Sequence, residues 1–153
     1  MFKNTTATVA TVAPLALGIA SGLSTTMDKA WYANLRKPQW TPEPWVFGPV
    51  WSALYLAQGV ALARIVSSSS PNVAYAVSLF AVQFCLNLLW TPTFFGKKKT
   101  KEALSVLRAM CILAVATGLA FYSIDSRAGL LFVPYVLWLF VALDLNAFIV
   151  DNN

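Results

Sequence analysis

Residues 129–150, GLLFVPYVLWLFVALDLNAFIV, form a long apolar run interrupted by one charge, Asp144. In a helix that rises 1.5 Å per residue, about 20 residues cross the roughly 30 Å of bilayer hydrocarbon. A helix also pairs its own backbone groups, which hydrocarbon requires. Four more runs of this kind precede it, so the sequence predicts an all-α membrane bundle of five helices in one domain, residues 1–153. The five expected spans are Ala7–Thr26, Trp45–Val66, Val73–Phe95, Ala103–Ile124 and Gly129–Val150.

The composition supports a bilayer environment and excludes several kinds of chemistry. Of the 153 residues, 58% are hydrophobic and 11% are charged, whereas a soluble domain is about one quarter charged. The chain has no histidine, and its two cysteines, Cys85 and Cys111, lie inside apolar runs. The common zinc and haem-ligand spacings and the Ser-His and Cys-His catalytic pairs are therefore excluded. We expect neither a metal nor a cofactor.

The first span has an alternative interpretation as a signal peptide. Lys3 precedes an apolar run that ends in the small residues Ala20, Ser21 and Gly22, a pattern that signal peptidase substrates share. Cleavage would leave four spans. Sequencing the N-terminus of the mature protein distinguishes the two cases.

The distribution of positive charge predicts the orientation of the bundle. Cytoplasmic connections of membrane proteins are enriched in Lys and Arg. The Met27–Pro44 and Gly96–Glu102 connections would share one side with the C-terminus, which we expect to be cytoplasmic. Basic residues scattered between apolar runs favour lipid head groups, not nucleic acid, as partners. The expected cytoplasmic cations are Lys29, Arg36, Lys37, Lys97, Lys98, Lys99 and Lys101, against Lys3, Arg64 and Arg127 on the opposite side.

The stretch 31–55, WYANLRKPQWTPEPWVFGPVWSALY, is the richest in tryptophan and proline. Proline restricts backbone angles, so we expect the connection 27–44 to be an ordered lid. An alternative for Trp31 and Trp45 is an aromatic belt, because tryptophan commonly anchors the ends of spans at the membrane interface.

Three of the expected helices carry aromatic and amide side chains on one face. Because amides at membrane depth need partners, these faces should point inward. The alternative is that Gln83, Asn87 and Asn146 only hold helices together by hydrogen bonds. Three converging aromatic faces favour a pocket for a flat, largely apolar ligand, which the rings would stack on and the amides would orient. The faces are Trp51, Tyr55 and Gln58; Gln83, Asn87 and Trp90; and Tyr135, Trp138, Ala142 and Asn146.

The motif W-Y-x-x-L-x-K-P-x-W-x-P, beginning at Trp31, is followed by W-x-F-x-P-V-W-x-x-L-Y, beginning at Trp45. Together they resemble the translocator protein family, also called tryptophan-rich sensory proteins and related to the peripheral-type benzodiazepine receptor. The resemblance extends over essentially the whole chain. Its further positions are Gln83, Asn87, Trp90 to Pro92, Phe94, Phe95, Val133 to Tyr135, Trp138, Ala142, Leu145 and Asn146.

This resemblance implies a function and a site. Members of the family form five-helix bundles, often homodimers, that bind porphyrins such as protoporphyrin IX and synthetic benzodiazepine-type or isoquinoline ligands under the first connection. It implies a binding or transport role in a bacterial envelope membrane or the mitochondrial outer membrane. The ligand-binding positions carried over are Tyr32, Trp51, Asn87, Trp90, Tyr135, Trp138 and Ala142.

An enzymatic role is the alternative that the resemblance raises. Some bacterial relatives degrade protoporphyrin in light, and Trp51 and Trp138 match the indoles implicated there. We expect a binding or transport protein, with tryptophan-dependent photo-oxidation as the alternative activity.

Two departures from the family pattern bear on the lid and on sterol binding. The usual W-x-P-P-x-W reads W-T-P-E-P-W here, so Glu43 replaces a proline. The cholesterol-recognition pattern near the C-terminus is broken at Ala147 and Asp151, where it requires an aromatic and a basic residue. Sterol therefore ranks below porphyrin as the expected ligand.

The sequence also predicts an ion pair that does not come from the family. Arg108 and Asp144 should lie at the same depth in the fourth and fifth spans, and charges within membranes usually pair. We expect a bridge between them on the side of the fifth helix away from Tyr135. The alternatives are that Asp144 relays protons, or that both side chains extend separately to the interface.

Overall fold

The computed structural model describes residues 2–153, with side chains from Thr5 onward. The all-α class is confirmed, and five of the helices in this part of the chain are long and apolar enough to cross a membrane. The first helix begins earlier than expected, and the third span ends in a π-helical turn. The elements are α1 (Phe2–Ser24), α2 (Lys29–Asn34), α3 (Pro44–Val66), α4 (Val73–Thr91), η1 (Pro92–Gly96), α5 (Thr100–Ile124) and α6 (Ser126–Asn152).

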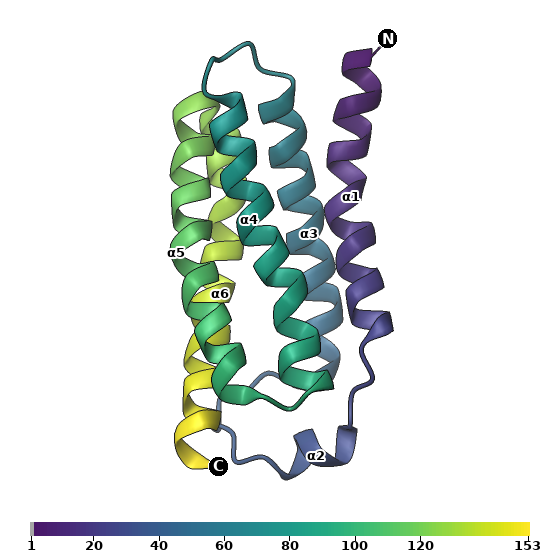
Figure 1. Cartoon of the computed structure of the whole chain (residues 1–153), viewed down its shortest axis with the longest axis vertical. Helices are drawn as coiled ribbons and strands as arrows, with labels where there is room; N and C mark the ends of the chain where they lie inside the picture. Colours follow the sequence, from purple (N-terminus) through teal and green to yellow (C-terminus); the bar gives the residue numbers. More distant parts are fainter. Residues whose placement is uncertain (1) are drawn as a thin grey trace.

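The five long helices run up and down alongside one another (Figure 1). Helix α1 packs mainly against α3, and α5 packs against both α4 and α6. The short helix α2, the connection between η1 and α5, and the C-terminus all lie at one end of the bundle, opposite the N-terminus (Figure 1). The expected lid, the lysine-rich connection and the C-terminus thus share one end. The side chain of Lys3, which the charge count placed at the other end, lies outside the described residues.

Helices α1 and α3 approach closely because two glycines leave room. A Cβ atom on Gly18 would overlap the ring of Tyr55, and one on Gly59 would overlap the backbone carbonyl of Thr11. Small residues at helix interfaces allow such close backbone packing in membranes. The seam between α1 and α3 is therefore closed along this part of its length.

The half of the bundle away from α2 is filled by aromatic rings. Phe80 stacks on Phe84 with ring centroids 5.6 Å apart and on Phe121 at 6.0 Å. Phe132 meets Phe121 edge to face at 5.3 Å. Offset and edge-to-face pairs add roughly 0.5–1.5 kcal/mol each beyond the area they bury. These rings belong to the main hydrophobic core of the bundle.

A single residue, Asp125, connects α5 to α6. Its carboxylate accepts a hydrogen bond from the backbone N–H of Arg127 at 2.9 Å and pairs with Arg64 of α3 at 2.7 Å. Desolvation alone would raise the pKa of Asp125, but the hydrogen bonds from Arg64 and the backbone outweigh it and keep the pKa below its ordinary 3.8. The pair ties the end of α3 to the α5–α6 turn.

The predicted bridge between Arg108 and Asp144 is not formed. No ion pair joins them in the part of the chain that the structure describes, and both side chains are exposed on the outside of the bundle. Helix α5 instead turns Leu107 and Cys111 inward, and the Cys111 thiol donates to the carbonyl of Leu139 on α6. The prediction matched the two charges by their depth in the membrane. Their side chains project from α5 and α6 to the outside of the bundle and not toward each other.

The glycine contacts generate a stability prediction. We expect Gly59→Leu to lower the free energy of unfolding by about 1–3 kcal/mol or more, because the side chain must displace the backbone of α1. Thermal unfolding in detergent, followed by circular dichroism, measures the change. Gly22→Ala is the matched control, since a Cβ there meets no atom within 4 Å. Equal loss of stability in both variants would contradict this account of the seam.

Candidate functional site

A cavity of about 340 Å³ lies inside the bundle at the end that α2 covers. Helices α1, α3, α4 and α6 form its sides, and α2 and η1 contribute residues near its end. Its volume is at the lower end of the range of small-molecule sites. The lining residues are mostly apolar or aromatic: Gly18, Ile19, Gly22, Thr25, Met27, Tyr32, Pro44, Phe47, Gly48, Trp51, Ser52, Tyr55, Asn87, Trp90, Thr91, Phe94, Phe95, Trp138, Ala142, Leu145 and Asn146.

All but one of the ligand-binding positions named from the sequence line this cavity. The exception is Tyr135, which is fully buried behind it. The structure therefore brings together indoles and an amide from three helices that are far apart in the sequence. The predicted positions in the cavity wall are Tyr32, Trp51, Asn87, Trp90, Trp138 and Ala142.

A chain of side-chain hydrogen bonds begins at the cavity wall and runs into the bundle. The Tyr55 hydroxyl donates to Asn87 Oδ1 at 2.6 Å, and Asn87 Nδ2 donates to the Tyr135 oxygen at 3.0 Å. The Tyr135 hydroxyl donates to Gln83 Oε1 at 2.8 Å, and Gln83 Nε2 donates to Gln58 Oε1 at 3.3 Å. The chain joins α3, α4 and α6, so it holds the walls of the cavity in place.

A second amide, Asn146, fixes Trp90. The indole N–H of Trp90 donates to Asn146 Oδ1 at 3.2 Å, and Asn146 Nδ2 donates to the backbone carbonyl of Thr100 at 3.1 Å. Gln83, which does not line the cavity, therefore holds helices together, as the alternative interpretation proposed, whereas Asn146 does so and also lines the cavity. Asn87 both holds helices together and faces the cavity.

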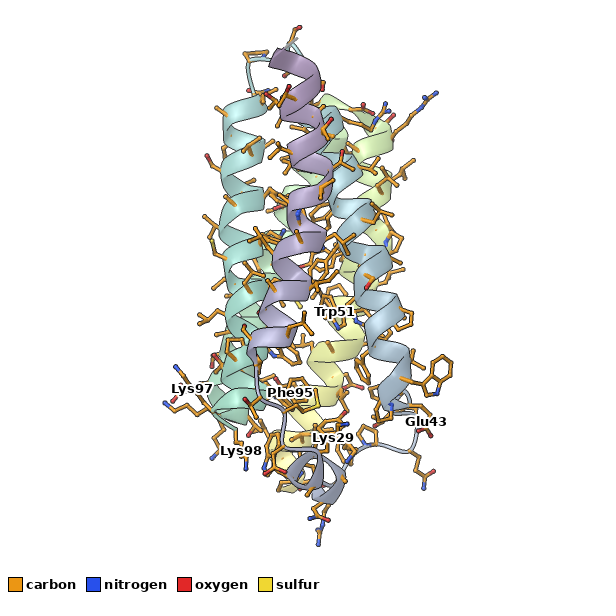
Figure 2. All side chains as sticks on the ribbon, turned by 90° about the vertical axis from the view of Figure 1, so that its right-hand side faces the viewer. Lys29, Glu43, Trp51, Phe95, Lys97 and Lys98 are labelled. Carbon is orange, nitrogen blue, oxygen red and sulfur yellow. The ribbon has the colours of Figure 1, made fainter. Side chains whose placement is uncertain are left out.

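The two indoles named for photochemistry contact other rings of the site. Trp51 lies 5.5 Å from the Tyr55 ring and 6.4 Å from the Tyr135 ring, measured between centroids. Trp138 meets Phe47 edge to face at 5.9 Å, and its indole N–H has no protein acceptor. Figure 2 shows Trp51 inside the bundle, between α1 and α3. Aromatic rings gathered in this way suit a flat apolar ligand.

The π-helical turn η1 places two phenylalanines at the end of the cavity. Proline has no backbone N–H and disfavours a regular continuation of the preceding helix, and here the Lys97 N–H donates to the carbonyl of Pro92, five residues back, at 2.9 Å. This turn stacks Phe94 on Trp90 at 5.1 Å and brings Phe95 to the cavity. Single π-helical turns are frequent at functional sites.

The connection 27–44 covers the end of the bundle where the cavity lies, and its contacts involve side chains other than its prolines. Asp28 caps α2 by accepting from the Trp31 N–H at 2.9 Å, and Lys37 Nζ donates to the carbonyl of Leu35 at 3.0 Å. Trp31 meets Phe94 edge to face at 5.8 Å, and Tyr32 meets Phe95 at 5.6 Å. Burial raises the pKa of Tyr32, so its phenol stays neutral.

An ion pair latches this cover to the connection after η1. Lys98 Nζ lies 2.8 Å from Asp28 Oδ2, and Lys98 has a left-handed backbone with φ of 56°. The hydrogen bond from Lys98, together with that from the Trp31 backbone, lowers the pKa of Asp28 below its ordinary 3.8. A lowered pKa means that the pair is fully formed above pH 3.8 and is lost only as the pH falls further.

Sequence reasoning missed the α1 wall of the cavity. Gly22 was noted as a small residue at the end of a possible signal peptide, and no side-chain pattern marks this wall. In the structure, Gly18 is in close contact with the ring of Tyr55 on α3.

The described residues contain no cluster of three or more His, Cys, Asp or Glu that could hold a metal ion.

Comparison with known proteins gives the family. Residues 10–151 match the TspO/MBR family over nearly the full chain. The chain belongs to the TspO/MBR family. The resemblance seen in the tryptophan and proline motifs is therefore confirmed.

The chain is similar to several named TspO/MBR relatives. It is 42% identical to a tryptophan-rich sensory protein of Cereibacter sphaeroides over 76% of this chain and 72% of that protein. It is 38% identical to the tryptophan-rich protein TspO of Chlorobaculum tepidum over 91% and 90%. It is 35% identical to the human translocator protein over 80% and 75%.

The polar chain generates a prediction about coupling between two residues. We expect Asn87→Leu to destabilise the bundle, because it leaves the Tyr55 hydroxyl without an acceptor. Removing that hydroxyl as well, in Tyr55→Phe/Asn87→Leu, should cost less than the sum of the single changes. Hydrogen bonds between membrane helices average about 0.6 kcal/mol and reach about 1.7 kcal/mol in double-mutant cycles. Thermal unfolding of the four proteins measures the coupling, and strict additivity would rule the bond out as a stabilising contact.

Proposed function

We propose that this TspO/MBR protein binds porphyrins, protoporphyrin IX in particular, and related flat hydrophobic ligands, and moves them within or across its membrane. The observation that carries the proposal is the cavity under α2, into which three tryptophans project from three helices: Trp51, Trp90 and Trp138. Such rings supply dispersion and stacking to a planar ligand.

The polar groups of the cavity support the same ligand class. The wall is mostly apolar, and Asn87 and the unpartnered indole N–H of Trp138 are two of its polar groups, which suits a mostly apolar molecule with some hydrogen-bond acceptors. Sterol is the weaker candidate, because the recognition pattern is broken at Ala147 and Asp151.

We further propose a homodimer in a bacterial envelope membrane or the mitochondrial outer membrane, with the C-terminus in the cytoplasm. The exposed small residues of α4 support an interface there, since they would let a second helix approach closely. The cations at the α2 end support the orientation. These small residues are Ala74, Ser78, Ala81 and Cys85.

The binding proposal predicts a selective effect of tryptophan substitution. Absorbance titration of protoporphyrin IX into the purified protein should give saturable binding. Trp51→Ala and Trp138→Ala should each weaken the affinity about tenfold, which corresponds to about 1.4 kcal/mol of lost ring contact. Trp45→Ala is the matched control, because Trp45 is 75% exposed and lies outside the cavity wall, and it should change the affinity less than about twofold. No saturable binding by the unaltered protein would refute the proposal.

Photo-oxidation of the bound porphyrin is the second candidate activity. Trp51 and Trp138 both line the cavity, where an excited porphyrin could take an electron from an indole. Dioxygen would be the net oxidant, taking up the electrons and supplying the oxygen atoms that the oxidised porphyrin gains. Under illumination in air, we expect the double variant Trp51→Phe/Trp138→Phe to slow any light-dependent spectral change at least about tenfold, a barrier increase of about 1.4 kcal/mol. Trp45→Phe serves as the control. A change that proceeds equally fast in the double variant would remove these indoles from the reaction.

A further inference from the structure

The cavity has two boundaries, and they differ in how they are closed. One is the cover formed by α2 at the end of the bundle. The other is the seam between α1 and α3, which faces outward along the side of the bundle (Figure 2). The first faces water and the second faces lipid, because both α1 and α3 are long, apolar helices.

The cover is fastened at several separate points. Rings of α2 pack against Phe94 and Phe95, and the Lys98–Asp28 pair closes one side. At the other side, the Arg36 N–H donates to Asn153 Oδ1 at 2.8 Å, and Asn153 Nδ2 donates to the Arg36 carbonyl at 3.1 Å. Opening the cavity to water would break all of these contacts.

The α1–α3 seam, in contrast, is closed over only part of its length. Gly18 against Tyr55 and Gly59 against Thr11 leave no space between the helices. One turn further along α1, Gly22 lines the cavity and is exposed, and so is Gly48 on α3. A Cβ atom on either of these glycines would meet no atom within 4 Å.

Gly22 and Gly48 therefore flank an opening from the cavity to the side of the bundle. Ser52, one helical turn after Gly48, is also exposed and also lines the cavity. All three residues lie within helices long and apolar enough to span the membrane, near the ends that approach α2. Because the residues on both edges are small, no large side chain closes this part of the cavity wall.

We propose that the ligand exchanges between the cavity and the bilayer through this opening, the α1–α3 window, while the α2 cover stays closed. The inference rests on the proposed function and adds the route and the ligand class. A planar apolar molecule dissolved in lipid keeps its apolar surface away from water along this path. A water-soluble molecule would instead have to pass the fastened cover.

The route can be tested without any porphyrin. A cysteine placed at Ala142, in the cavity wall on α6, reports access in a background carrying Cys85→Ser and Cys111→Ala. The full-length protein in phosphatidylcholine vesicles is treated with an apolar, lipid-dissolved maleimide or with a sulfonate-bearing, water-soluble thiol reagent. We expect the apolar reagent to modify the A142C thiol at least tenfold faster, after correction for the rates with free thiols in the same medium.

Substitutions at the window and at the latch separate the two routes. Gly22→Leu and Gly48→Leu together should slow the apolar reagent at least tenfold. Ala20→Leu and Ala53→Leu are matched controls, because both alanines are exposed on the same helices and lie outside the cavity wall, and they should change the rate less than twofold. Lys98→Glu, which repels Asp28 and loosens the cover, should also change it less than twofold.

The opposite pattern would overturn the window. If Lys98→Glu speeds modification tenfold and the glycine variants have no effect, exchange passes the α2 cover. Thermal unfolding of each variant establishes that it is folded, and Gly22→Leu alone serves if the double variant is not. Stopped-flow binding of protoporphyrin IX then gives the second measurement: the window variants should slow both association and dissociation, whereas Lys98→Glu should change neither rate more than twofold. Absent binding by the unaltered protein contradicts the proposed function, whereas the cysteine result still decides the route.

Discussion

The hydrogen-bonded chain from Tyr55 through Asn87, Tyr135 and Gln83 to Gln58 determines how three of the five helices pack. In hydrocarbon an amide without a partner costs several kcal/mol, so these side chains favour arrangements of α3, α4 and α6 in which the chain forms. At its end, Gln58 Nε2 is buried without a partner among the described residues. On one side of it the phenylalanines pack without a large gap. On the other side the tryptophans cannot fill the space between the same helices, and the cavity is the result. The polar chain is thus both the main specific contact of the bundle and the inner wall of its site.

Much of this could be predicted from the sequence because helical spacing determines which residues share a face. The residues of the predicted faces from Trp51 to Gln58 and from Tyr135 to Asn146 are spaced three or four residues apart, so each set shares one face of its helix. In hydrocarbon, polar faces turn inward. What spacing cannot give is the rotation of one helix relative to another. Arg108 and Asp144 were matched for depth, yet their side chains point outward from α5 and α6 and do not pair. Tyr135 was assigned to the correct face but lies one layer behind the wall.

The glycines show why the remaining wall escaped prediction. Gly18 and Gly59 are required by contact, whereas Gly22 and Gly48 have no neighbour at all where a side chain would stand. In the sequence all four are simply glycines in apolar helices. Only the structure shows that α1 and α3 are close together at Gly18 and Gly59, where the seam is closed, and that Gly22 and Gly48 have no such neighbours. The π-helical turn is similar, since Pro92 predicts an interruption of the helix but not that Phe94 would come to stack on Trp90.

The stability of the α2 cover depends more on its rings than on its charges. Both partners of the Lys98–Asp28 pair are more than two-fifths exposed, and pairs this accessible to water contribute little to stability. Trp31 and Tyr32, in contrast, are partly buried against Phe94 and Phe95, and such aromatic contacts add about 0.5–1.5 kcal/mol each to the area they bury. Salt that screens the ion pair therefore leaves most of the closing energy in place. An entrance through the cover would have to separate these aromatic pairs for every ligand, whereas Gly22 and Gly48 at the α1–α3 window have no side chains that would have to separate.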